Sequence, residues 1–134
     1  MNDVFVGRLM SSPVETVRVD TPVVEAGRTM LDEGIGSLVV SDGDGHLEGI
    51  VTATDFVHVV AEELAAGATT VGEVMSTGVV TTTATDDVRD VADLMLERDI
   101  HHVPVVDPTE GVVGMLSTTD LAAYLSRSAS PEQT

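Results

Sequence analysis

The sequence predicts an α/β (α+β) fold in which two pseudo-symmetric units follow one another, each with the element order β-α-β-β-α. Three observations lead to this expectation. The chain repeats itself, its apolar residues change from helical to strand spacing at the same places in both copies, and turn-forming residues separate those segments. With 134 residues, the chain is long enough for one sizeable core or two small lobes.

The repeat is visible when the sequence is compared with itself at an offset of 65. Residues 6–57 then align with residues 71–122 without a gap, and 15 of the 52 positions are identical. Composition alone would give about five identities, so the match indicates a duplication. We therefore expect repeat 1 at residues 1–67, repeat 2 at residues 68–128 and a flexible C-terminal tail at 129–134.

Each repeat opens with a short turn, at residues 6–10 and 71–75, and an extended β-branched segment, at 14–19 and 79–83. A helix follows, which in the first copy Thr21 is expected to cap, with Pro22 at its first position and Gly34 at its end. Strand pairs joined by turns come next, at 37–41 with 47–51 and at 103–106 with 112–116. Closing helices are expected from about residue 55 to 66, stopped by Gly67, and from about residue 120 to 128.

The closing helices are apolar on nearly all sides. Their apolar residues are Phe56, Val57, Val59, Val60, Ala61 and Leu64 in the first copy, and Leu121, Ala122, Ala123, Tyr124 and Leu125 in the second. A helix with one side in water does not have this pattern. We expect one face to pack on its own sheet and the other on a second copy of the chain, giving at least a homodimer. The alternative is that both faces are covered within the monomer.

Charge excludes several classes of partner. The chain has 23 acidic residues against 6 basic ones and a formal net charge of −17. This charge repels nucleic acids and anionic membrane surfaces, and no apolar run approaches the roughly 20 residues that span a bilayer. We therefore expect no nucleic-acid or membrane partner. The absence of cysteine excludes disulfides and fits a cytoplasmic protein.

All six basic residues are arginines, and lysine is absent. This acidic, lysine-free composition suggests adaptation to high salt, as in a halophilic archaeon, because concentrated salt screens the repulsion among surface carboxylates. An acidic protein from an ordinary environment is the alternative.

The same motif ends the second strand pair of each repeat. The two stretches read Gly49-Ile-Val-Thr52-Ala-Thr-Asp55-Phe56 and Gly114-Met-Leu-Ser117-Thr-Thr-Asp120-Leu121. They resemble the signature that closes a cystathionine-β-synthase (CBS) domain, and Ile100-His-His-Val-Pro-Val-Val-Asp107 resembles the middle strand pair of that family. The resemblance covers residues 6–125, and two such domains in tandem form a Bateman module.

This resemblance implies a sensor in which AMP, ADP, ATP or an S-adenosyl compound occupies one of two clefts between repeats packed sheet to sheet. In the family the aspartate of the Ser/Thr-x-x-Asp motif holds both ribose hydroxyls, which maps onto Asp55 and Asp120. Thr52 and Ser117 would face the phosphate or the ribose. An ionised carboxylate accepts well from two neighbouring hydroxyls. The alternative is that Asp55 and Asp120 are helix N-caps.

The same resemblance assigns further residues to the ligand. The base would be bordered by Thr16, Val17, Thr81 and Thr82, with Ile50 and Met115 as apolar walls, although the apolar members could equally be core. His101 and His102 stand before Val103 and Pro104 where family members carry basic residues, whereas the first copy has Gly36 and Ser37. Adjacent strand residues point to opposite faces, so we expect at most one histidine to reach a ligand, and two unequal clefts.

Other chemistry is not supported by the sequence. Asp42-Gly-Asp44-Gly45 is similar to the start of a calcium loop but lacks the distal ligands, so we interpret it as a hairpin turn. Zinc spacing, a Walker loop and a nucleophile elbow are missing, so we expect neither an enzyme nor a resident metal or cofactor. Our leading hypothesis is a regulatory adenine-nucleotide module acting on an unknown protein partner in trans. The alternatives are a constitutive dimeric scaffold with vestigial clefts and a divalent-cation sensor.

Overall fold

The computed structural model describes residues 4–128, so the expected tail at 129–134 lies outside the described residues. The mixture of helices and short strands confirms the predicted α/β class. The chain forms two compact units. We call Val14–Val79 the central unit, and Met1–Pro13 together with Val80–Thr134 the terminal unit. None of the helices in the described range is long and apolar enough to cross a membrane.

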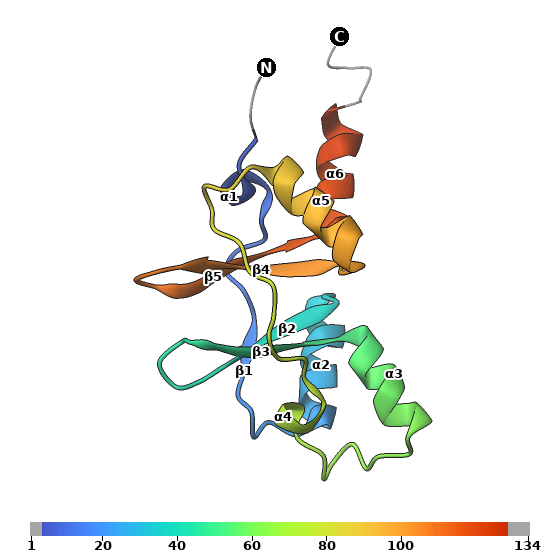
Figure 1. Cartoon of the computed structure of the whole chain (residues 1–134). Coiled ribbons are helices and arrows are strands. Elements are labelled where there is room, and N and C mark those ends of the chain that lie inside the picture. The colour runs from blue at the N-terminus through green and yellow to red at the C-terminus, as the bar shows by residue number, and fades with distance from the viewer. Residues whose placement is uncertain (1–3, 129–134) are drawn as a thin grey trace. The chain divides into compact units, whose positions relative to one another are not determined.

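The central unit contains a three-stranded sheet. Strand β1 (Thr16–Val17) pairs in parallel with β2 (Ser37–Ser41), and β2 pairs antiparallel with β3 (Leu47–Thr52). Helices α2 (Val23–Glu33) and α4 (Val71–Val74) cover one face of this sheet, and α3 (Ala53–Ala61) continues directly from β3 (Figure 1). The unit has a buried core of Ala26, Met30, Leu38, Val40, Val51 and Val71.

The terminal unit repeats this arrangement with a shorter sheet. Strand β4 (His102–Asp107) pairs antiparallel with β5 (Gly111–Ser117), and helices α1 (Val6–Leu9), α5 (Val88–Arg98) and α6 (Thr118–Ser128) lie on one side of the pair (Figure 1). The counterpart of β1 is reduced to a single parallel bridge between Thr82 and Val105. The core consists of Val6, Val91, Met95, Val103, Val105 and Leu116.

The compact units do not coincide with the sequence repeats at 1–67 and 68–128, because the repeats exchange their opening segments. Helix α1 belongs to the first repeat but lies in the terminal unit, where Val6 is fully buried. Helix α4 opens the second repeat but lies in the central unit, where Val71 is fully buried. Each core therefore takes one valine from the other repeat, and burying such a side chain contributes about 1.5–3 kcal/mol.

Helix α3 is shorter than the sequence predicts. We expected it to continue to residue 66 and stop at Gly67, but it ends at Ala61. Glu63 adopts a positive φ of 57°, its N–H donates to the Val60 carbonyl at 3.2 Å, and the Leu64 N–H donates to the Val59 carbonyl at 3.0 Å. This pair of bonds is a Schellman motif. The expectation was wrong because it required a glycine at the left-handed position, which Glu63 occupies instead.

Two other local predictions need correction. Pro22, not Thr21, stands at the N-cap of α2, because the Thr21 Oγ1 accepts the Arg18 N–H at 3.2 Å within the preceding turn. The predicted extended segments shorten to the two residues of β1 in the central unit and to the Thr82 bridge in the terminal unit. The stop of α2 at Gly34 is confirmed by its left-handed φ of 65°.

The exchange leads to a first testable prediction. A fragment of residues 14–79 contains the whole central unit, so it should unfold cooperatively on heating. A fragment of residues 1–67 lacks Val71 and α4 and should show no cooperative transition. Circular dichroism melts of both fragments in about 2 M KCl, which screens the acidic surface, would test this.

Val71→Asp in the 14–79 fragment is the matched control, because it places a charge in the core and should abolish the transition. A cooperative melt of residues 1–67 equal to that of residues 14–79 would contradict the exchange.

Candidate functional site

The two Ser/Thr-x-x-Asp motifs lie at junctions where the last strand of a unit passes into a helix. In the central unit, Thr52 is the N-cap of α3 and Asp55 stands at the third helical position. The Asp55 Oδ2 accepts the Thr52 N–H at 2.8 Å and lies 3.5 Å from the Thr52 Oγ1. The carboxylate therefore forms one half of a capping box, which holds the side chain in place.

The terminal unit has the same junction with a tighter set of bonds. The Asp120 Oδ2 accepts the Ser117 N–H at 2.9 Å and the Ser117 hydroxyl at 3.0 Å. The Asp120 N–H lies 3.2 Å from the Ser117 Oγ, which completes the reciprocal pair. Neither aspartate is itself the N-cap, so the alternative drawn from the sequence is corrected: the hydroxyl residue caps, and the aspartate supports it.

The remaining carboxylate oxygens differ between the two junctions. The Asp120 Oδ1 accepts the Ser11 hydroxyl at 3.0 Å, a contact across 109 residues of sequence. Within residues 4–128, the Asp55 Oδ1 has no hydrogen-bond partner, and its side chain is only partly buried. Asp55 therefore presents one oxygen that its own fold does not use.

The glycine of each motif permits a close approach beside the junction. Ser11 pairs with Met115 through bonds of 2.8 and 3.0 Å, and Ser76 pairs with Ile50 through bonds of 2.9 and 3.0 Å. A Cβ on Gly49 would lie 2.6 Å from the Ser76 carbonyl oxygen.

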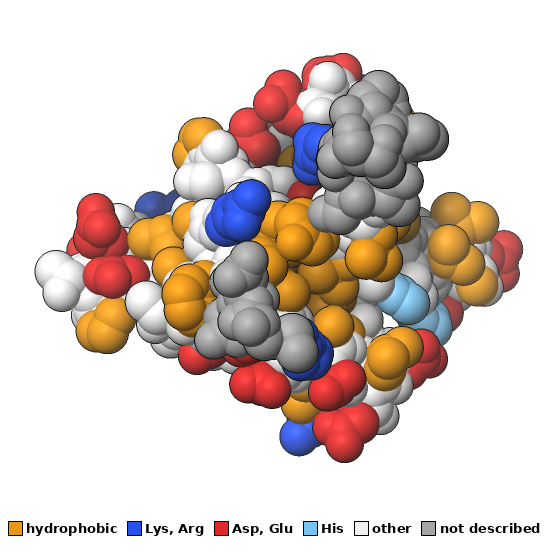
Figure 2. Space-filling view, turned by 90° about the horizontal axis from the view of Figure 1, so that it is seen from above, with side chains coloured by type: hydrophobic (Ala, Val, Ile, Leu, Met, Phe, Trp, Pro, Cys, Tyr) orange, Lys and Arg blue, Asp and Glu red, His pale blue; other side chains and the backbone are white. Residues whose placement is uncertain are grey.

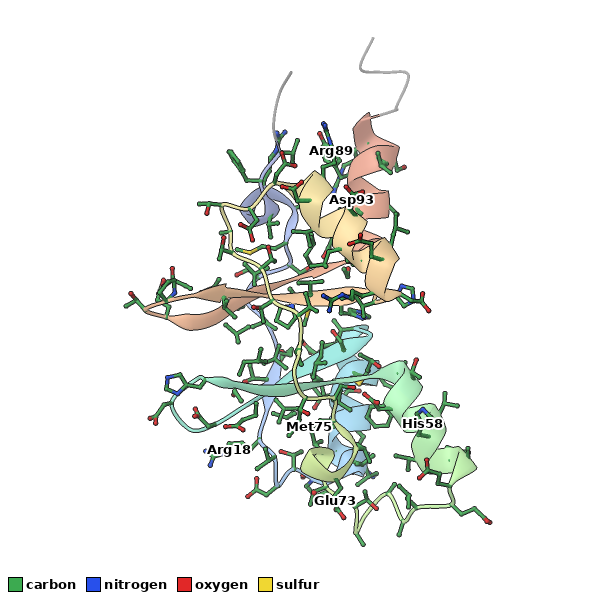
Figure 3. The ribbon with its side chains drawn as sticks, in the orientation of Figure 1. Arg18, His58, Glu73, Met75, Arg89 and Asp93 are labelled. Atoms are coloured by element: carbon green, nitrogen blue, oxygen red, sulfur yellow. The ribbon has the colours of Figure 1, made fainter. Side chains whose placement is uncertain are left out.

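A Cβ on Gly114 would lie 3.0 Å from the Ser11 carbonyl oxygen and 2.6 Å from the Met10 sulfur. Met75 has the matching place in the central unit, where its sulfur would lie 2.8 Å from a Cβ on Gly49 (Figure 3). We did not select Ser11 or Ser76 from the sequence, although their identity in the repeat was the available signal.

The repeated architecture corresponds to a known family. The model of the CBS domain matches residues 6–62 and 71–127. The chain belongs to the CBS domain family, as a tandem pair. The pair is similar to the CBS domain pair of protein MJ0100, with 28% identity, a TM-score of 0.88, and 95% of this chain and 99% of that one covered. That structure is a complex with 5′-methylthioadenosine and S-adenosyl-L-methionine.

Other relatives include single modules and larger enzymes. A CBS-domain protein of Burkholderia ambifaria, provisionally assigned to signal transduction, is 29% identical, with a TM-score of 0.87 and coverage of 95% of this chain and 97% of that one. The L-aspartate semialdehyde sulfurtransferase of Methanocaldococcus jannaschii is 32% identical over 114 residues, which make up 85% of this chain and 22% of the enzyme. The homoserine O-acetyltransferase of Methanosphaerula palustris is 29% identical over 95% of this chain and 25% of the enzyme. The CBS pair thus spans about a quarter of these enzymes or less.

The residues expected to border the base have different environments in this CBS pair. Thr16 and Thr81 are exposed, and Val17 is half-buried on β1. Thr82 is buried, and its hydroxyl donates to the Asp86 Oδ2 at 2.5 Å, which together with the Thr83 N–H lowers the pKa of Asp86. The Thr82 hydroxyl therefore stabilises the turn before α5.

The expected apolar walls and the strand residues near the motifs are mostly buried. Ile50 and Met115 are each 7% exposed and belong to the residues that pair with Ser76 and Ser11. Val103 is a member of the terminal core, and the buried Pro104 accepts the Thr82 N–H at its carbonyl. Val103 therefore packs in the terminal core, whereas Ile50, Met115 and Pro104 are buried outside the two core clusters.

The two copies differ in polarity beside the motif. His101 is exposed, and His102 is half-buried on β4, where it pairs with Ser117. Burial lowers the pKa of His102, His101 lowers it further, and the Asp120 carboxylate acts in the opposite direction. The central unit has the exposed Gly36 and the buried Ser37 at these positions. A titratable ring is therefore part of the Asp120 junction and has no counterpart at Asp55.

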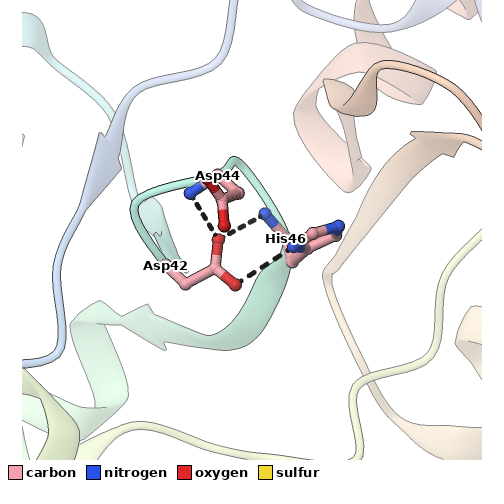
Figure 4. Close-up of side chains that lie close together, drawn as sticks. All are labelled: Asp42, Asp44 and His46. Atoms are coloured by element: carbon pink, nitrogen blue, oxygen red, sulfur yellow. Dashed lines mark hydrogen bonds and ion pairs between the residues drawn. The ribbon is translucent and has the colours of Figure 1, made fainter.

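The Asp42-Gly-Asp44-Gly45 segment is a hairpin turn, as the sequence indicates. The Asp42 Oδ1 accepts the N–H groups of Asp44 at 2.8 Å and His46 at 3.0 Å, and its Oδ2 lies 3.1 Å from the His46 Nδ1 (Figure 4). These bonds, the one from the His46 N–H foremost, lower the pKa of Asp42. The Asp42, Asp44 and His46 ligand atoms lie within 4.8 Å of one another, but the bonds within the turn already account for this arrangement.

The lowered pKa of His102 predicts a pH dependence of stability. The unfolded chain takes up the proton near the ordinary pKa of 6.5, before the folded chain does. The stability that the neutral His102 ring allows is therefore fully present above that pH, and it is lost as the pH falls toward the pKa of His102 in the folded chain. His102→Gln should make the urea midpoint less dependent on pH between about 7 and 5 than in the unmodified protein.

His58→Gln is the matched control, because His58 is exposed on α3 and is not among the groups that shift the pKa of His102. If the urea midpoint of His102→Gln still fell between about pH 7 and 5 as steeply as that of the unmodified protein, the pH dependence would not come from His102.

Proposed function

We propose that this CBS domain pair is a regulatory module that binds an adenosyl ligand, of the AMP, ADP, ATP or S-adenosyl type, and acts on a partner protein in trans. It would use the ligand as a signal and need no resident cofactor. One observation carries the proposal: Asp55 is held by its helix through Oδ2 and keeps Oδ1 without a partner among the described residues.

The chemistry of that oxygen suits a ribose. Two neighbouring hydroxyls donate to one carboxylate, and such charge-assisted bonds are stronger than bonds between neutral groups. Because the capping box already holds the side chain in one orientation, binding would immobilise little further. The adenosyl compounds in the complex of the MJ0100 CBS pair support the ligand class. The chain matches only about a quarter of the length of a related enzyme, which supports a regulatory role and not a catalytic one.

Substitution of the carboxylates tests this function. Asp55→Asn and Asp120→Asn keep one oxygen for the cap but remove the charge and one acceptor. Each should weaken adenosyl binding at its own site by about ten- to a hundredfold, the loss expected for charged hydrogen bonds. Isothermal calorimetry with AMP, ADP, ATP and S-adenosylmethionine, in about 2 M KCl with Mg²⁺, would measure it.

Glu73→Gln is the matched control. Glu73 Oε2 accepts the Thr70 N–H at 2.7 Å and the Thr70 hydroxyl at 3.0 Å in a capping box at α4, outside the two motifs. Its substitution should leave ligand affinity unchanged. If the unmodified protein bound none of the four adenosyl compounds, the scaffold alternative would be favoured. Calorimetric binding of Mg²⁺ without nucleotide would favour the cation sensor.

We further propose that the module acts as a homodimer through its exposed apolar helix faces. In α3, Phe56 packs against the central core and Val59 is buried, whereas Val57 and Val60 are 66% and 78% exposed. Leu31 and its repeat equivalent Leu96 are 84% and 81% exposed, and Leu125 of α6 is 65% exposed. Figure 2 shows hydrophobic side chains gathered over the face of the terminal unit that carries α1, α5 and α6, with acidic side chains around its margin. Patches of this kind favour association with another protein surface.

Val60→Glu tests the dimer. A charge on the exposed face of α3 should convert the dimer to a monomer, because an unpaired charge would be buried at the interface. Sedimentation velocity in about 2 M KCl would measure the change. Val19→Glu, at a side chain 42% exposed outside α2 and α3, should leave the dimer intact. A monomeric unmodified protein would contradict this part of the proposal.

A further inference from the structure

The two proposed ribose carboxylates are in unequal states although the repeat makes their surroundings alike in sequence. Both motifs end in Asp, and both junctions have a serine beside them, Ser11 or Ser76, paired to the last strand. Asp120 has both oxygens occupied by its own unit, whereas Asp55 has one. The difference lies in the serine hydroxyl: Ser11 Oγ donates to Asp120, and Ser76 Oγ makes no side-chain hydrogen bond within residues 4–128.

The residues after each serine differ as well. Ser12 Oγ donates to the Val113 carbonyl at 3.0 Å, so the segment stays attached to β5 for one residue beyond Ser11. In the central unit the following residues are Thr77 and Gly78, and Gly78 has a positive φ of 64°. Glycine adopts this left-handed conformation readily, and within the described residues Thr77 makes no bond matching that of Ser12. The segment of Ser11, which lies beside Asp120, therefore has one side-chain bond to the last strand that the segment of Ser76 lacks.

We infer that Ser11 makes the two sites unequal in affinity, so that the Asp55 site binds its adenosyl ligand first and the Asp120 site binds at higher ligand concentration. The inference rests on the proposed function. A ribose needs both of its hydroxyls to donate to the carboxylate, and at Asp120 it must displace the Ser11 hydroxyl from Oδ1. At Asp55 the corresponding oxygen is open to the ligand. Loss of one hydrogen bond to a charged group at an exposed position corresponds to about three- to tenfold in affinity.

The consequence is a sensor with two response ranges built from one duplicated motif. Ser11 does not have to touch the ligand to set the weaker affinity, since it acts by occupying the carboxylate oxygen. The bound form of Asp120 would therefore release the Ser11 hydroxyl, while the backbone bonds between Ser11 and Met115 stay in place.

Single-site backgrounds separate the two affinities. Asp55→Asn weakens the Asp55 site, so that binding reports mainly on the Asp120 site, and Asp120→Asn does the reverse. Ser11→Ala in the Asp55→Asn background should tighten binding by about three- to tenfold, because the competing hydroxyl is removed. Ser76→Ala in the Asp120→Asn background is the matched control and should leave affinity unchanged. S-adenosylmethionine, 5′-methylthioadenosine and AMP serve as probes in calorimetry at about pH 7.5, above the ordinary pKa of histidine.

The outcomes distinguish this inference from the proposed function. If the unmodified chain binds a probe but Ser11→Ala leaves the affinity of the Asp120 site unchanged or weaker, Ser11 does not compete with the ligand. The proposed function then stands, while the inference about Ser11 is overturned. Tighter binding in the Asp55→Asn background than in the Asp120→Asn background would also overturn it. If the unmodified chain binds none of the probes, the proposed function itself is overturned. Because Ser11→Ala keeps the backbone pairing with Met115, a cooperative thermal transition would show that the variant is folded.

Discussion

Each motif carboxylate has to serve its own helix before it can serve a ligand. Oδ2 of Asp55 and of Asp120 accepts the N–H of the residue three positions earlier, at 2.8 and 2.9 Å. These bonds satisfy donors that the first turn of a helix otherwise leaves open. They also hold the second oxygen in a single direction at the end of a strand. The structural role and the proposed binding role therefore use different oxygens of one side chain, and both can hold at once.

The serine segment beside each carboxylate depends on a close approach that only glycine permits. Residues Gly49 and Gly114 let the segments of Ser76 and Ser11 lie against the last strand, where a Cβ would meet a carbonyl oxygen at 2.6 or 3.0 Å. The same segments carry α4 and α1, whose valines complete the two cores. Packing of the core and geometry of the site are thus set by the same segment, which comes from the other repeat in each unit. A change in one is expected to disturb the other.

Duplication did not produce two equivalent junctions. The repeats share Ser11 with Ser76 and Asp55 with Asp120, yet the hydroxyl bond exists at one junction only. His102 stands beside Asp120, whereas Ser37 has its place in the central unit. The two junctions therefore differ in hydrogen bonding and in the titratable ring beside the motif, although both units keep the same fold. This is the physical basis on which one CBS pair could respond to ligand in two ranges.

The order of elements, the strand pairs, the duplication and the Ser/Thr-x-x-Asp motifs were predictable from the sequence, because hydrophobic period, turn residues and repetition are local or periodic signals. The end of α3 was not, since its Schellman motif places Glu63 where glycine is the usual indicator. The exchange of α1 and α4 and the bond from Ser11 to Asp120 were decided only by the tertiary structure. They join residues far apart in sequence, 109 positions in the case of Ser11, and no local pattern states which of two identical serines will reach a carboxylate.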